Sequence, residues 1–167
     1  MSSKLISSIA LTACLLASGG AFAEVLYQQA PTADVTGFSA NLSGDPLLTQ
    51  TIPSLGSATL DKINWWGYRD PFNDPYPTEI ESFNVYLGGS IVSGGLSRDL
   101  GTALPNTQRL LFKYTLDVPD APLTATELGI ENVNDLVSWF WQGSGADPAT
   151  TGLVAFSLEG TRNGGVV

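Results

Sequence analysis

Oxygen-bearing side chains gather in a proline-rich segment over residues 69–78. Asp70, Asn73 and Asp74 lie within five positions, and Pro71, Pro75 and Pro77 restrain the backbone between and after them. Carboxylate and amide oxygens are the ligands that Ca²⁺ prefers, and turn carbonyls can complete its shell. The spacing is not that of an EF-hand loop, so a polar turn closed by its own Asx side chains is the alternative. Calcium at Asp70, Asn73 and Asp74 is the one metal site that the sequence suggests.

The same region supplies carboxylates for acid–base chemistry. Asp70, Asp74, Glu79 and Glu81 are the candidates for a pair that cleaves a glycosidic bond, which would have to face each other across about 5 to 10 Å. The alternative is a solvated carboxylate or a pair with Arg69. The chain has no histidine, so it cannot assemble a Ser-His-Asp triad or offer imidazole ligands. No nucleophile elbow, P-loop or dinucleotide fingerprint is present. We therefore expect a protein that is not an enzyme.

Two adjacent tryptophans form the other candidate site. Successive side chains of a strand point to opposite faces, so Trp65 and Trp66 cannot enter the same core. Trp66 and Tyr68 share their face with the polar residues Lys62 and Asn64, whereas Trp65 shares its face with Ile63. The alternation predicts that Trp65 is inside and that Trp66 and Tyr68 lie on or near the outer face.

An outward-facing ring can stack on the apolar face of a sugar. Trp66, Tyr68 and Tyr86 would form such a platform, with Asn64 hydrogen-bonding the sugar hydroxyls. The alternative is that these rings pack in the core or beneath the loop that contains Pro71 and Phe72, because large aromatic rings supply much of the buried surface of any sandwich. The sequence leaves both interpretations open.

Short β-prone runs broken by turn residues position these side chains. No long stretch has helical periodicity, and the alternation at Phe83-Val85-Leu87 indicates a sheet with one covered face. Trp139 and Trp141 fall on one side of a strand and are expected in the core. The pattern predicts an all-β, antiparallel two-sheet β-sandwich of the jelly-roll kind, with a helical turn near 131–136 and a chain reversal at 88–101. The expected strands are 25–28, 37–42, 48–52, 58–68, 80–87, 108–118, 123–128, 136–142 and 153–159.

The first residues have the layout of a secretory signal peptide. Lys4 precedes an apolar run over 5–17, and Ala21-Phe22-Ala23 matches an A-x-A cleavage site. Residues 1–23 are thus a predicted leader, 24–162 the β-sandwich domain and 163–167 a flexible C-terminal end. The rival interpretation is a lipobox at residues 11–14, with Cys14 lipidated. Either route predicts an exported protein, secreted or at the cell surface.

The net charge of the chain limits the classes of molecule that it can bind. The chain carries 7 basic and 16 acidic side chains, a formal net charge of −9, and cleavage of the leader removes Lys4 as well. This balance repels phosphate backbones, so nucleic acid is not an expected partner. Beyond the leader, no stretch is long and apolar enough for a membrane-spanning segment. Extracellular polysaccharide or other surface proteins are the expected partners, and no cofactor other than calcium is suggested.

Four segments carry a resemblance to a known group. They are INWWGY at 63–68, ESFNVY at 81–86, VSWFWQ at 137–142 and AFSLEG at 155–160. In this order they resemble secreted Gram-negative β-sandwich proteins that often carry a PEP-CTERM sorting tail. The resemblance implies a surface or matrix protein of exopolysaccharide-producing cells, without catalytic residues. The sequence ends at Val167 with no sorting tail in view, which fits either a truncated chain or a released protein.

Three functions follow, in order of preference. The first is a non-enzymatic structural or adhesive protein of the envelope or biofilm. The second is a carbohydrate-binding module, which requires Trp66 and Tyr68 to be exposed together. The third is a glycoside hydrolase, which requires two carboxylates facing each other in a cleft.

Overall fold

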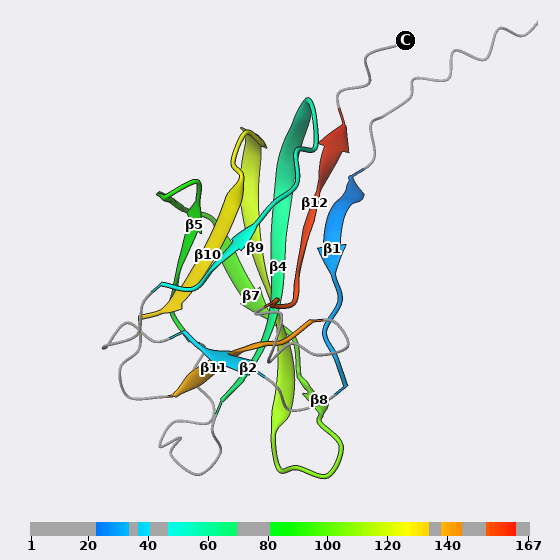
Figure 1. The fold of residues 1–167 in the computed structure, drawn as a ribbon, viewed down its shortest axis with the longest axis vertical. Coiled ribbons are helices and arrows are strands. Elements are labelled where there is room, and N and C mark those ends of the chain that lie inside the picture. Colours follow the sequence, from blue (N-terminus) through cyan, green and yellow to red (C-terminus); the bar gives the residue numbers. More distant parts are fainter. Residues whose placement is uncertain are drawn as a thin grey trace, which may run out of the picture.

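The computed structural model describes residues 23–33, 37–40, 47–69, 81–133, 138–144 and 153–162, which form strands and connecting turns and contain no helix. Two antiparallel sheets pack face to face, so the predicted β-sandwich is confirmed (Figure 1). The larger sheet has eight strands: β1 (Glu24–Gln29), β2 (Gly37–Ser39), β4 (Ala58–Arg69), β7 (Gly95–Arg98), β8 (Thr102–Ala103), β9 (Leu110–Pro122), β11 (Trp139–Gln142) and β12 (Phe156–Arg162). The smaller has four: β3 (Thr49–Thr51), β5 (Phe83–Leu87), β6 (Ser90–Val92) and β10 (Glu127–Asn132).

The 12-residue strand β4 is the axis of the larger sheet. β9 pairs with one of its edges, while β12 and then β11 pair with the other. Ile63 and Trp65 on β4 lie opposite Leu116 and Tyr114 on β9, which places all four on the inner face. β4 therefore determines which side chains enter the core and which face outward.

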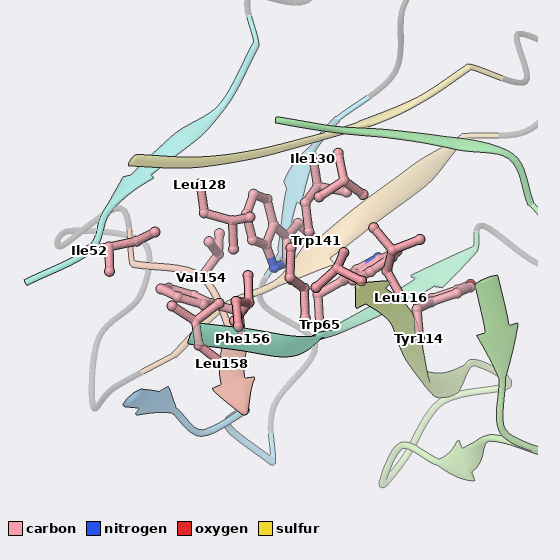
Figure 2. Close-up of a cluster of buried hydrophobic side chains, with 14 of the residues drawn as sticks. Ile52, Trp65, Tyr114, Leu116, Leu128, Ile130, Trp141, Val154, Phe156 and Leu158 are labelled. Atoms are coloured by element: carbon pink, nitrogen blue, oxygen red, sulfur yellow. The ribbon is translucent and has the colours of Figure 1, made fainter. Parts of the chain in front are cut away.

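The core lies between the inner faces of the two sheets. Leu128 and Ile130 of β10 meet Trp65, Trp141 and other large side chains of the larger sheet (Figure 2). The predictions that Trp65, Trp139 and Trp141 are core residues are confirmed, since each is fully buried. Burial of one such side chain contributes roughly 2 to 3 kcal/mol to folding.

Four aromatic rings form one end of this core. Trp65 and Tyr114 stack with their centroids 5.6 Å apart and 13° between their planes. Phe83 meets Trp65, Tyr114 and Trp139 edge-on, at 5.3, 4.9 and 4.8 Å. These offset and edge-on arrangements are the favourable ones for aromatic pairs, so the rings fix one another in position.

Several predicted element boundaries need correction. β9 continues to Pro122, and the next strand, β10, covers Glu127–Asn132 in place of the expected 123–128. Glu131 and Asn132 consequently lie in a strand, which overturns that part of the predicted helical turn. The segment 88–101 contains the strands β6 and β7 as well as a chain reversal. Gly88 and Gly89 form that reversal, and both have positive φ, as the two-residue turn between β5 and β6 requires.

The predicted leader, including Cys14, lies outside the described residues except for Ala23, and so does the predicted C-terminal end. Within the described part of the chain, no helix is long and apolar enough to cross a membrane.

Candidate ligand-binding surface around Trp66

Trp66 lies on the outer face of the larger sheet, as the alternation predicts. Its neighbour Trp65 is 0% exposed, whereas Trp66 is only partly buried. Lys113 stands opposite Trp66 in the register with β9, and its ammonium nitrogen lies 5.7 Å from the centroid of the Trp66 ring. A cation at this distance from an indole face is attracted to it. Trp66 and Lys113 together, called the Trp66 surface below, combine a flat ring with a hydrogen-bond donor.

Asn64 does not serve as a free sugar-binding group, which corrects the sequence-based prediction. The side chain is 1% exposed, although it points to the outer face. Its Oδ1 accepts a hydrogen bond from the Thr115 hydroxyl at 2.7 Å, and its Nδ2 donates to Ser157 at 3.1 Å and Glu159 at 2.7 Å. The amide thereby links β4 to both β9 and β12. Its donors and acceptor are used to hold these three strands together, so they are not free to bind a sugar.

Tyr68 is also covered, which corrects its expected place in an exposed platform. The residue is 3% exposed, and its ring stacks on Phe140 of β11, with centroids 5.4 Å apart and planes at 16°. The Arg109 guanidinium lies 5.1 Å from the Tyr68 ring centroid. A Cβ atom at Gly37 would lie only 2.8 Å from the Tyr68 hydroxyl, so β2 also passes close to it. Trp66 and Tyr68 are therefore not exposed together.

Tyr86 belongs to the other sheet, so it does not share a surface with Trp66. It alternates on β5 with buried Val85, which places Tyr86 on the outer face of the smaller sheet. Its hydroxyl donates to Glu131 at 2.9 Å, and Asn84 donates to the same carboxylate oxygen at 3.2 Å. This hydrogen bond, with some burial, raises the pKa of Tyr86. The two outer faces look in opposite directions, so the predicted platform reduces to Trp66.

Glu81 is held in a buried ion-pair network. It is 1% exposed, accepts a hydrogen bond from Arg69 Nε, and accepts another from Arg98 Nη1 at 2.9 Å. The alternative that Glu81 pairs with Arg69 is thus confirmed. Arg98 was not expected there, because it comes from β7, which the sequence did not predict as a strand. With both carboxylate oxygens engaged by guanidinium groups, Glu81 has a structural role at the end of the core.

Tyr114 extends this network into the aromatic cluster. The Trp139 indole N–H donates to the Tyr114 hydroxyl at 3.3 Å. Burial, and then the negative charge of Glu81, raise the pKa of Tyr114 above its ordinary value of 10.0. A neutral phenol is therefore maintained in the folded state at pH values where an unfolded chain would ionise it.

This pKa shift predicts a loss of stability at high pH. Below pH 10 the Tyr114 phenol is protonated in both the folded and the unfolded state, so its contribution to the unfolding free energy is fully present. Above pH 10 the unfolded chain loses the proton first, so the unfolding free energy should fall by up to about 1.4 kcal/mol per pH unit. Chemical denaturation from pH 8 to 11 checks this, with Tyr114→Phe expected to show a shallower decline. Equal slopes for the two proteins would contradict it.

The predicted calcium ligands Asp70, Asn73 and Asp74 lie outside the described residues, as does Glu79. Among the residues that the structure describes, no three acidic, histidine or cysteine side chains come together as a metal site. Calcium at the 69–78 segment stays a prediction.

Comparisons with known proteins add no relative: no family model, no curated protein and no solved structure matches the chain.

Proposed function

We propose that the chain is an exported, non-catalytic β-sandwich that acts as a structural or adhesive module outside the cell and contacts polysaccharide through the Trp66 surface. Export is supported by the leader-like layout of residues 1–23. A partner protein at the same surface is the alternative occupant.

The observation that carries this proposal is the different environment of the two neighbouring indoles. Trp65 is fully buried in the core, whereas Trp66 is only partly buried and lies beside Lys113. The Asn64 hydrogen bonds tie β4 to β9 and β12, so the strand that carries the ring is already ordered before binding. A single ring on a flat sheet provides a small contact area. The contact is accordingly weak at each site, which suits adhesion to a repeating polymer.

Two observations support this proposal over the other functions. A dedicated carbohydrate-binding groove requires Tyr68 beside Trp66, and Tyr68 is covered by Phe140. A glycosidase requires a free acid and base, and Glu81, the one described candidate, is engaged by Arg69 and Arg98.

Affinity electrophoresis tests the proposal. Native gels containing neutral dextran or acidic alginate should retard the wild-type protein, and Trp66→Ala should abolish the retardation while keeping the fold. Tyr86→Ala is the matched control, because it removes an aromatic ring from the opposite outer face. It should migrate like the wild type. The proposal fails if the wild type is not retarded by either polymer, or if Trp66→Ala is retarded as strongly as the wild type.

A further inference from the structure

Two positive side chains, Lys113 and Arg109, lie over aromatic rings on the outer face of the larger sheet. Lys113 lies over the Trp66 ring, and Arg109, which directly precedes β9, lies 5.1 Å from the centroid of the Tyr68 ring. Within the described part of the chain, no carboxylate oxygen lies within 4 Å of either charged group. The other cationic side chains described there all pair with carboxylates: Lys62 with Asp117, Arg162 with Glu24, and Arg69 and Arg98 with Glu81.

The composition of the chain makes these two cations informative. The chain has 16 acidic side chains against 7 basic ones, so carboxylates are not in short supply. Lys113 and Arg109, called the cation pair below, are held by the ring faces instead. An ammonium group has three N–H donors and a guanidinium group has five. The cation pair can therefore bind an anion without first breaking an ion pair between described residues.

The two rings place the cation pair beside the exposed part of the indole. Trp66 and Tyr68 are two positions apart on β4 and both face outward, so their Cα atoms lie about 7 Å apart. Trp66 is partly buried, whereas Tyr68 is 3% exposed. The Tyr68 ring therefore supports Arg109 and does not itself meet a ligand. The resulting surface has one accessible aromatic ring and two neighbouring positive charges.

The density of charge on the ligand decides what such a surface can hold. Duplex DNA carries one negative charge per roughly 1.7 Å of its axis, and the acidic remainder of this chain repels so dense an array. A polysaccharide with one carboxylate per sugar is charged more sparsely. Repulsion from exposed charges beyond about 8 Å is largely screened at physiological ionic strength, whereas contact with the cation pair is local. Carboxylates on a sugar polymer thus match both the rings and the charges.

We propose that the polysaccharide bound at the Trp66 surface is an acidic one, whose carboxylates pair with Lys113 and Arg109 while a sugar ring stacks on Trp66. This inference rests on the proposed contact with polysaccharide and adds the chemical class of the polymer. Arg109 extends the binding surface along β4, at the position where the Tyr68 ring is covered.

Affinity electrophoresis with a matched pair of polymers tests the chemical class. Alginate carries a carboxylate on each sugar, and in its propylene glycol ester these carboxylates are masked. Mobility is expressed relative to a polymer-free gel, which corrects for the altered charge of each variant. Alginate should retard the wild-type chain at least about threefold more strongly than the ester, because two ion pairs form only with the free carboxylates.

Glutamine variants identify the cations involved. Lys113→Gln and Arg109→Gln each remove one charge but keep a hydrogen-bond donor, so each should weaken retardation by alginate about two- to fivefold and leave retardation by the ester unchanged. Lys62→Gln is the matched control, because it removes the same charge from the same outer face, where Lys62 is already paired with Asp117. It should be retarded like the wild type. Circular dichroism confirms that each variant is folded.

Two results would overturn the acidic class while leaving the polysaccharide contact in place. One is that alginate retards the wild type no more than the ester does. The other is that folded Lys113→Gln and Arg109→Gln are retarded by alginate as strongly as Lys62→Gln. If alginate, its ester and dextran all fail to retard the wild type, the proposed function itself fails and this inference fails with it.

Discussion

Glu81→Gln is expected to lower the unfolding free energy by about 3 to 5 kcal/mol, because it leaves the buried Arg69 and the partly buried Arg98 without their shared carboxylate. Glu81 accepts hydrogen bonds from Arg69 and Arg98 and is buried itself. The glutamine oxygen can serve one guanidinium group, but its amide NH₂ must then face the other, donor against donor. Arg98 also stacks on Phe112, with 4.4 Å between its guanidinium carbon and the ring centroid, so it is not free to move toward solvent.

Urea-induced unfolding measures this effect. Glu127→Gln is the control: Glu127 is an exposed residue of β10, and its substitution should change the unfolding free energy by less than about 0.5 kcal/mol. If Glu81→Gln destabilises the protein no more than Glu127→Gln does, the ion-pair network is not a structural element.

Gly67→Ala is expected to destabilise the fold by about 3 kcal/mol, at the upper end of the usual cost of overpacking. A Cβ atom at Gly67 would lie 2.1 Å from Cζ2 of Trp139 and 2.8 Å from the Phe140 carbonyl oxygen. The Trp139 indole cannot withdraw, because it is fully buried and held edge-on by Phe83 and Tyr114. The backbone of β4 is thus in direct contact with the ring.

The control for this substitution is Gly95→Ala in β7, where the nearest atom to the added Cβ is a side-chain oxygen of Asp117 at 4.0 Å. Thermal and chemical unfolding should show almost no loss for Gly95→Ala. The double variant Gly67→Ala/Trp139→Leu should cost less than the sum of the two single variants, because the smaller side chain relieves the clash. Additive losses would show that the Trp139 ring is not what excludes a side chain at Gly67.

These contacts explain the Trp-Trp-Gly motif residue by residue. Trp65 fills the core, Trp66 faces outward, and Gly67 leaves space for Trp139 from the neighbouring strand. The first two roles could be predicted from alternation alone, since a strand has a period of two. The third could not, because it depends on which strand pairs with β4 and in which register.

The same limitation accounts for the errors at the site. Alternation correctly assigns Asn64 and Tyr68 to the outer side of β4, but it does not show that Thr115 and Ser157 lie beside Asn64 or that Phe140 covers Tyr68. Nor does it assign Tyr86 to a particular sheet. Exposure therefore depends on long-range pairing, whereas inward or outward direction is a local property of the strand.

Hydroxyl-radical footprinting of the four tryptophans tests the division of β4 into a core face and an outer face most directly, because side-chain oxidation follows solvent exposure and tandem mass spectrometry separates neighbouring residues. Trp66 should be oxidised much faster than Trp65, Trp139 and Trp141, which are each fully buried. Oxidation of Trp65 as fast as Trp66, or equal protection of both, would contradict the assignment of the two neighbouring indoles to different environments.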